Sequence, residues 1–386
     1  MENKLLYYCL FLLGLLSCSP SHQTQVSGVT LIETPDTLSF MIKPSVSVYN
    51  HSLQLFTDTD GKEYITLFDK GSTEIQFYDL HVPDLLKSIK FEKEGPNGIG
   101  NSYLFYMKDW DTLYIPARDL PMIYVMNSEG QIERTLDFTN NSEITVFNSY
   151  FYHSIFVSQN KLYSYIAPRR TSSDILLESP SEIAIDLETG NYMLSPNLLN
   201  QEMNQAISGQ QFIPNSLALT SRCFDGENLV YSYSYNDSLV VMSPDFSSVT
   251  SKIAKSRYIK TLDIPQKYSG DFDENWRQYC SDAFYGHIVY DPYRKLYYRF
   301  AYPQTELDSK KENWYDLSQS GRNEFSIIVL DEDLNVIGET MFPRDRFRSN
   351  LYFVCKDGFY ISCNHYKNPG FTDDKLQFVK FELKRE

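Results

Sequence analysis

The sequence predicts an all-β protein, a six-bladed β-propeller whose ring is closed by an N-terminal strand that completes the last blade. Residues 101–138 hold four short runs rich in Tyr, Ile, Leu, Val and Thr, with turn residues between them. A polar residue recurs ahead of such runs along the chain. A unit of this size buries both faces only by stacking against copies of itself, so these observations together favour a ring of similar sheets.

The stretch 101–138 is expected to form an antiparallel meander. Its four runs cover residues 103–107, 112–115, 122–126 and 131–138. Gly, Asn, Asp and Pro separate them, which are the residues that tight turns require. We name the four strands of such a unit a, b, c and d in chain order.

The spacing of the polar residue gives the number of units. It occurs at Asn50, Asn101, Asn148, Asn215, Asp282 and Asn350. The first two steps match one propeller blade, and the longer later steps imply insertions inside similar units. Asp282 is assigned by counting back from the strand that starts at Lys295. Six units follow, with eight as the competing count because the chain length also allows it.

The last unit ends one strand short, after residues 376–384. The apolar run of residues 37–43 lies before the first polar mark and is expected to pair beside that last strand. Such closure removes the exposed strand edges that a linear array would leave. The propeller domain is therefore expected to cover residues 37–386.

The first 17 residues have the layout of a secretory signal peptide. Lys4 precedes an apolar run that is too short to span a bilayer. The small residue Ser17 before Cys18 resembles the lipobox of bacterial lipoproteins, in which the cysteine is lipidated. We expect a signal peptide at 1–17 and a lipidated Cys18 with a polar tether at 18–36; the alternative is an ordinary signal with an incidental cysteine. No aspartate follows Cys18, which favours the outer membrane facing the periplasm, although either membrane and either side stay open.

Composition narrows the range of partners. The 386 residues include 35 basic and 50 acidic side chains, a net charge of -15. Nucleic acids and anionic membrane surfaces select for Lys and Arg, so neither is expected as a partner, and the membrane is expected to be contacted through the lipid anchor only. Aromatic residues make up 15% of the chain. They fit packed sheets and could also form a surface for stacking sugars.

Cysteine and histidine give no sign of a metal site. Cys355 and Cys363 flank a turn expected at Asp357–Gly358, and that register does not place them opposite each other, so no disulfide is expected between them. The state of Cys223 and Cys280 stays open. His153 and His287 follow their polar marks by the same spacing, but two histidines are too few for a metal centre. No nucleotide or dinucleotide fingerprint is present, and no cofactor is expected.

The connections between strands predict one plain and one elaborated face of the ring. In an antiparallel meander, the a–b and c–d turns share one face, and these are short here. The b–c loops and the crossings between units share the other, and residues 168–181, 195–214, 255–281, 302–323 and 364–374 all lie there. We call these the plain face and the elaborated face. The crossing at 255–281 should hold a helix that is capped by Asp271 or Asp273 and packs through Trp276, Tyr279, Cys280 and Ala283.

The polar and basic residues expected on the elaborated face are the candidate ligand-binding residues. They are Asn50, Asn101, Arg118, Asn148, Arg169, Arg170, Asn215, Arg277, Asp282 and Asn350. A ring of amides could hold a polar ligand, and the arginines could bind a carboxylate, sulfate or phosphate. The structural alternatives are that the asparagines bond backbone groups where the chain turns, and that the arginines are simply solvated.

Residues 91–100, FEKEGPNGIG, carry a resemblance to a known family. With the lipobox-like start and the six units, they resemble the TolB-like six-bladed propeller lipoproteins of unknown function from gut-dwelling Gram-negative bacteria. Related propellers often cross between blades through a Gly-x-Gly-Pro-Gly-Glu-like segment. Gly95, Pro96 and Gly98 fit that pattern, whereas Ile99 stands where the acidic residue would be. The resemblance implies a fold and a cell-envelope location, and it brings no catalytic residues.

Two functions remain open at this level. The first is a binding or scaffolding module for a glycan, a peptide or a partner protein of the cell envelope, with its site on the elaborated face. The alternative is a glycan-active hydrolase or lyase with carboxylates on that same face, of which Asp282 is the first to test. No catalytic residue can be assigned from spacing, because propeller sites draw their acids from different blades.

Overall fold

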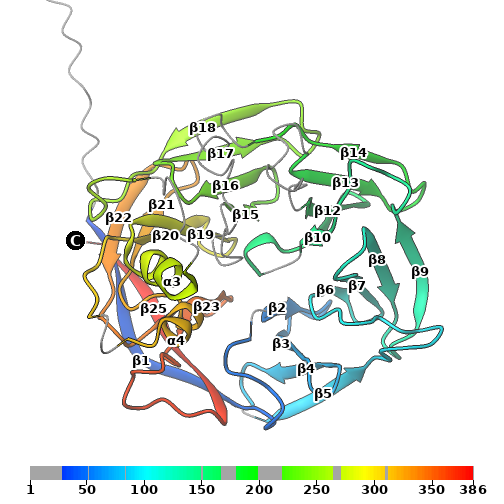
Figure 1. Ribbon diagram of the computed structural model, residues 1–386, viewed down its shortest axis with the longest axis horizontal. Coiled ribbons are helices and arrows are strands. Elements are labelled where there is room, and N and C mark those ends of the chain that lie inside the picture. The colour runs from blue at the N-terminus through cyan, green and yellow to red at the C-terminus, as the bar shows by residue number, and fades with distance from the viewer. Residues whose placement is uncertain are drawn as a thin grey trace, which may run out of the picture.

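The computed structural model describes residues 28–50, 52–82, 84–148, 151–166, 180–198, 220–263, 271–308 and 312–385. These residues form an all-β ring in which successive sheets surround a central axis (Figure 1). The predicted all-β propeller architecture is therefore confirmed.

Four sheets are built from strands that follow one another in sequence, and all their pairings are antiparallel. The first contains β2 (Gln54–Thr57), β3 (Glu63–Asp69), β4 (Glu74–Asp79) and β5 (Leu85–Lys90). The second contains β6 (Tyr106–Asp109), β7 (Thr112–Pro116), β8 (Met122–Met126) and β9 (Ile132–Asp137). The third contains β10 (Phe147–Asn148), β11 (Phe156–Ser158), β12 (Lys161–Ile166), β13 (Glu182–Asp186) and β14 (Tyr192–Leu194), with the short helix η1 (Phe151–His153) after β10. The fourth contains β15 (Thr220–Phe224), β16 (Leu229–Tyr233), β17 (Ser238–Met242) and β18 (Val249–Ile253).

The remaining strands form one eight-stranded sheet that joins the two ends of the chain. Its order is β19 (Phe284–Asp291), β20 (Leu296–Tyr302), β21 (Ser326–Leu330), β22 (Val336–Met341), β1 (Val29–Met41), β25 (Lys375–Arg385), β24 (Phe359–Ser362) and β23 (Arg348–Val354). Its two halves meet where β22 and β1 run parallel, through the pair Val29 and Gly338. A Cβ at residue 338 would lie 1.8 Å from the Val29 carbonyl oxygen, so only glycine allows this contact.

The predicted pairing of the N-terminal strand with the last strand is confirmed. β1 runs antiparallel to β25, with Thr37 opposite Val379 and Met41 opposite Lys375. The strand starts earlier than expected, because Val29 already pairs with Arg385. Val29 and Leu31 are buried. Residues 29–36, which the sequence assigned to a polar tether, therefore belong to the sheet.

Aromatic side chains fill the space between neighbouring sheets. Phe40 of β1 packs edge-on against Tyr78 of β4 and Phe378 of β25, with ring centroids 5.8 and 6.1 Å away. Trp110 from the β6–β7 turn makes a similar contact with Phe56, 4.9 Å away in the first sheet. The high aromatic content thus contributes to packing between sheets, as expected from the sequence.

The two faces of the ring differ as predicted. On the plain face, the connections are short turns, and none is longer than that of residues 243–248. On the elaborated face, the described parts of the connections include residues 91–105, 254–263, 271–283, 303–308 and 312–325. Both α-helices of the described chain, α3 (Phe272–Ser281) and α4 (Trp314–Ser320), belong to these connections. They lie in front of the sheets in Figure 1.

The predicted helix in the crossing before β19 is confirmed as α3. The side chain of Asp271 caps it by accepting a hydrogen bond of 3.1 Å from the Glu274 amide. Trp276, Tyr279 and Cys280 are buried against the propeller, as the helical spacing predicted. α4 was not predicted, although Asn313 caps its start and Gly321, with φ of 80°, ends it.

The hairpin between β23 and β24 corrects one prediction. Cys355 and Gly358 exchange two backbone hydrogen bonds of 2.9 and 3.2 Å, so the loop is Lys356–Asp357 rather than Asp357–Gly358. Glycine suits position 358, because the Lys380 side chain lies 2.9 Å from where a Cβ would be. Cys223, Cys280, Cys355 and Cys363 are free thiols in this structure.

Phe40→Ala should destabilise the protein by about 3–5 kcal/mol, because it leaves a cavity where β1, β4 and β25 meet. Met41→Ala is the matched control, since its side chain is 46% exposed and points away from that contact. Urea unfolding of the purified domain measures both. An equal loss in the two variants would show that the packing of β1 does not support the ring.

Candidate functional site

Four of the sequence-predicted residues cannot be placed. Arg169, Arg170, Asn215 and the lipidation residue Cys18 lie outside the described residues, and of Asn148 only the backbone is described, in β10. Of the other six, five fall in connections of the elaborated face, and Asn350 is the third residue of β23. The six are Asn50, Asn101, Arg118, Arg277, Asp282 and Asn350.

Two of the asparagines are bonded to nearby backbone. Asn50 donates from Nδ2 to the Phe68 carbonyl over 2.9 Å and accepts from the Ser52 amide over 2.8 Å. Asn350 donates from Nδ2 to the Gln319 carbonyl over 2.9 Å, at the end of α4. The Asn50 side chain fixes a chain turn, which is the structural alternative for the recurrence of asparagine, whereas Asn350 ties β23 to the end of α4. Asn101 is exposed.

Arg277 and Asp282 lie at the end of α3. Arg277 is paired on its own helix, where its Nε donates to Glu274 Oε2 over 2.8 Å. The Asp282 carbonyl accepts a hydrogen bond of 2.9 Å from Arg322 Nη2. Burial raises the pKa of the Asp282 carboxyl, the hydrogen bond to Gln278 and the charge of Arg322 oppose this, and the charge of Asp263 adds to it. A raised carboxyl pKa suits a general acid, the role that the hydrolase alternative would give Asp282.

Arg118 belongs to a basic pair that sequence spacing did not reveal. Lys70 Nζ lies 3.6 Å and the Arg118 guanidinium carbon 5.9 Å from the ring centre of Tyr103. Lys70 comes from the β3–β4 connection and Arg118 from the β7–β8 connection, both exposed on the elaborated face. Partial burial against the ring lowers the pKa of Lys70, and the charge of Arg118 acts in the same direction. We call Lys70, Arg118 and Tyr103 the basic pair with its ring.

Within the described chain, neither cation of the basic pair forms an ion pair with a carboxylate. Two neighbouring positive charges repel each other, and an anionic group between them would relieve that repulsion. An aromatic ring beside them adds a flat surface on which a sugar or a peptide side chain can stack. The basic pair with its ring can therefore contact an acidic glycan or peptide.

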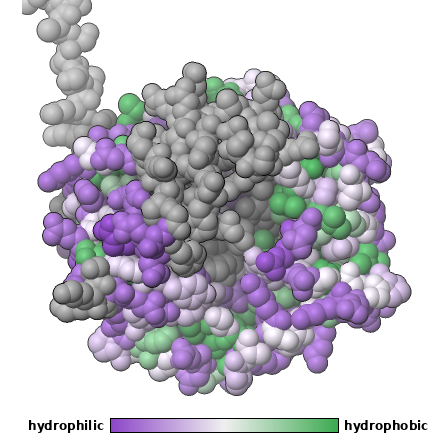
Figure 2. All heavy atoms as spheres, viewed as in Figure 1, coloured by the Kyte–Doolittle hydropathy of each residue, from purple (hydrophilic) through white to green (hydrophobic). Residues whose placement is uncertain are grey.

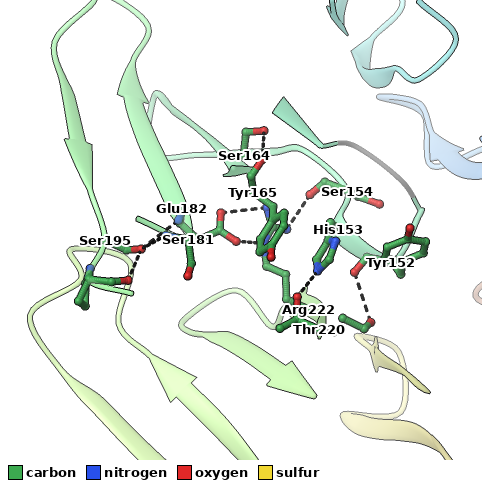
Figure 3. A network of polar contacts seen from close by, with 12 residues as sticks. Tyr152, His153, Ser154, Ser164, Tyr165, Ser181, Glu182, Ser195, Thr220 and Arg222 are labelled. Atoms are coloured by element: carbon green, nitrogen blue, oxygen red, sulfur yellow. Dashed lines mark hydrogen bonds and ion pairs between the residues drawn. The ribbon is translucent and has the colours of Figure 1, made fainter. Parts of the chain in front are cut away.

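A buried polar network joins the third and fourth sheets (Figure 3). Arg222 of β15 and Glu182 of β13 form a two-pronged ion pair, with Nε–Oε1 and Nη2–Oε2 distances of 2.5 and 3.2 Å. Arg222 Nη1 also donates to the Ser154 carbonyl over 2.7 Å. Burial raises the pKa of Glu182, and the charge of Arg222 opposes that change. This ion pair joins two sheets inside the protein.

His153 extends the network toward the axis. Its Nε2 lies 2.8 Å from Thr220 Oγ1, and its ring stacks on Tyr165 with centroids 3.9 Å apart. Burial lowers the pKa of His153 well below its usual value, and the charges of Arg222 and His287 act in the same direction. The imidazole is therefore neutral at physiological pH.

The two histidines of equivalent sequence spacing come together through one aromatic ring. Tyr152 stacks on His287 with centroids 5.4 Å apart and meets His153 edge-on at 5.0 Å. The part of the chain that the structure describes contains no group of three or more His, Cys, Asp or Glu arranged to hold a metal. The network is buried, so it holds sheets together rather than offering an open surface.

Sequence reasoning missed the charged members of this network, yet the strands carry a signal. Arg222 stands inside the strand TSRCF, and Glu182 opens the strand EIAID, at positions where a lone charge must be buried and paired. Arg299 in LYYRFAY is a third such residue. It donates to Ser232 Oγ and to the carbonyls of Tyr233, Asn236, Asp237 and Ala254, and so joins the eight-stranded sheet to the fourth.

The elaborated face is mostly hydrophilic where it is described, with smaller hydrophobic areas between polar ones (Figure 2). In the described ranges, no helix has the length and apolar character needed to cross a bilayer.

The neutral state of His153 predicts a pH dependence of stability. Its pKa is near 6.5 in the unfolded chain and well below that in the folded protein. As pH falls below 6.5, the unfolded state binds the proton first, so stability should fall by about 1.4 kcal/mol per pH unit for this site. Urea unfolding between pH 7.5 and 5 measures the slope, and His153→Gln should make it shallower by that amount. An unchanged slope in the variant would contradict a buried neutral His153.

Comparison with known proteins places the chain in a family. No curated protein sequence matches it. A DUF4221 protein of known structure from Bacteroides vulgatus is 26% identical, with 94% of this chain and 100% of that chain covered and a TM-score of 0.81. A protein named as exported, from Bacteroides fragilis, is 12% identical, with 94% of this chain and 98% of that chain covered and a TM-score of 0.53, which shows a shared fold.

The family model of DUF4221, a domain of unknown function, matches residues 28–341. The match starts one residue before β1 and ends with β22, so it contains the first four sheets and five strands of the eight-stranded sheet, β1 and β19 to β22. The predicted resemblance to a propeller family of unknown function is confirmed. The chain belongs to the DUF4221 family.

Proposed function

We propose that this protein is a binding module of the cell envelope that takes its ligand, a glycan or a peptide, on the elaborated face. One observation carries the proposal: in the described chain, both helices and the long connections lie on this face, while the plain face has only short turns. Insertions on a rigid ring are where binding surfaces are placed, because the scaffold holds loops in fixed positions without taking part itself.

The basic pair with its ring supports this choice of face. It gathers two cations and an aromatic side chain from three separate connections of the elaborated face, in a protein whose net charge is -15. The repulsion between Lys70 and Arg118 lowers the stability of the folded protein, and a purely structural role does not explain why these two cations are placed together. An acidic glycan or an acidic peptide would pair with both cations and pack against Tyr103.

We also propose that the ring has six blades. The eight-stranded sheet would count as two blades, β19 to β22 and β23 to β25 with β1, because the strand ladder joins its halves through a single residue pair, Val29 and Gly338. Each half then has four strands, like the first, second and fourth sheets.

The cell-envelope location and the lipid anchor are proposals as well. Residues 1–17 would be removed as a signal peptide, and lipidated Cys18 would hold the propeller through the segment that precedes β1. The outer membrane facing the periplasm remains our choice of membrane. The relative named as exported supports a location outside the cytoplasm.

Cys18→Ala should release the protein from the membrane into the soluble fraction, because without the thiol no lipid can be attached. Fractionation of cells, followed by washing of the membranes at high salt and high pH, measures this, with Ser19→Ala as the control. A Cys18→Ala protein that stays as firmly bound as the wild type would contradict the anchor.

Lys70→Ala/Arg118→Ala should weaken ligand binding at least tenfold, because about 1.4 kcal/mol or more is lost with two charge-assisted contacts. The measurement is an array of neutral, uronic-acid-containing and sulfated oligosaccharides and of acidic peptides, followed by titration of the strongest ligand. Lys295→Ala/Lys356→Ala is the matched control, since it removes two exposed lysines from the plain face. Loss of binding in the control alone would show that the ligand uses the plain face.

A further inference from the structure

Arg348, the first residue of β23, is a fully buried cation with few partners. Its Nε donates to Asn350 Oδ1 over 2.8 Å, and its Nη1 donates to the Val48 carbonyl. Its Nη2 has no hydrogen-bond acceptor among the described residues. No carboxylate acts on its charge: burial alone lowers the pKa of Arg348 to about 9, opposed only by Tyr49.

Arg299 and Arg222 show what a satisfied guanidinium looks like in this protein, whereas the Nε of Arg322, which is also buried, has no acceptor among the described residues. Arg299, equally buried, donates to five oxygens on the neighbouring sheet. Arg222 has the carboxylate of Glu182. Arg348 has neither a full set of acceptors nor a counter-charge in the described chain, although it carries the same charge at the same depth.

His365 provides a second buried donor in the same region, because Arg348 pairs with Ser362 in the β23–β24 ladder and His365 follows three residues later. Its Nδ1 accepts a hydrogen bond of 3.3 Å from the Lys367 amide, so the proton of the neutral ring is on Nε2. Nε2 also has no acceptor in the described chain, and the side chain is fully buried. Burial lowers the pKa of His365 to about 3, and the charges of Lys367 and Arg348 act in the same direction, which places the guanidinium within electrostatic reach of the ring.

The two donors lie where the ends of the chain meet on the elaborated face. Arg348 begins β23 and His365 follows β24, while Tyr49 comes from the connection between β1 and β2. The Tyr49 ring centre is 5.0 Å from the guanidinium carbon, and this tyrosine is only partly buried. Next to Tyr49, therefore, only the tyrosine side chain lies between the guanidinium of Arg348 and solvent.

The arrangement is costly without a ligand. An unmade hydrogen bond on a buried donor costs about 1–3 kcal/mol, and more when the group is charged. An uncompensated buried ion costs several kcal/mol, which is why buried charges are usually paired. A negatively charged group that accepts from Arg348 Nη2 would balance its charge, and His365 Nε2 is the further donor available to such a group.

We propose that Arg348 Nη2 and His365 Nε2 form a binding site for one carboxylate, carried by a small ligand that enters beside Tyr49. A monoanion fits better than phosphate, because there is one positive charge to balance. The negative charges of Asp316 and Asp373 also act on Tyr49 at the entrance, and they would repel a dianion more strongly than a monoanion. The site does not depend on the basic pair with its ring, so it stands or falls separately from the function proposed above.

Binding of D-glucuronate and acetate to the wild-type protein tests the site, with glucose and inorganic phosphate as probes that lack a carboxylate. Isothermal titration should show glucuronate binding that Arg348→Met and His365→Phe each weaken at least tenfold. Arg299→Met is the matched control, because it removes an equally buried guanidinium that already has its acceptors. It should leave the affinity unchanged. If Arg348→Met does not fold, His365→Phe decides, since it keeps the guanidinium and the aromatic shape of the ring.

A crystal structure with glucuronate gives the second reading. A carboxylate oxygen within hydrogen-bonding distance of both nitrogens would support the site. An ordered water in that place at saturating glucuronate would overturn it, and so would equal affinity of the wild type and His365→Phe. Tighter binding of phosphate than of glucuronate would overturn the choice of a carboxylate.

Discussion

The antiparallel pairing of β1 with β25 is the interaction on which the ring depends. Each sheet buries one side against the sheet before it and the other against the sheet after it, so a ring with an unpaired end would leave apolar surface and a strand edge exposed. The side chain of Phe40 links the first and last sheets directly, because it contacts β4 of the first sheet and β25 of the last. The inner networks around Arg222 and Arg299 add polar cross-links between sheets that this closure already holds together.

Much of the fold could be predicted because propeller strands repeat the same local chemistry. The run at 122–126 became β8 with the same bounds, and the run at 112–115 became β7 with one residue more, whereas the run at 103–107 overlaps β6 only at residues 106 and 107. The helical spacing of Trp276, Tyr279 and Cys280 predicted α3 for the same reason. These signals are local, and local propensity agrees with the tertiary structure there. α4 escaped prediction because it is short and its polar sequence has no apolar stripe.

The site was much harder to predict, because its contacts join residues far apart in the chain. The recurrence of asparagine was read as a ring that could hold a ligand, but Asn50 and Asn350 bond backbone groups nearby. Arg118 was chosen by charge alone, and its neighbour Lys70 comes from a different sheet. The sequence does not show that Arg222 pairs with Glu182. It also does not show that Arg299 has all its acceptors whereas Arg348 lacks one. Such distinctions depend on register and crossing geometry rather than on spacing.

The join between Val29 and Arg385 has a consequence for the order of folding. The first strand of the domain to be synthesised is paired with the last, so it has no partner in its own sheet until the whole chain is available. Contacts of such long sequence separation are slow to form, because the entropy of closing the loop is lost before any of them stabilises the structure. The early sheets can assemble during synthesis, while the N-terminal strand waits for the C-terminus, and completion of the ring becomes the final step for every copy of the protein.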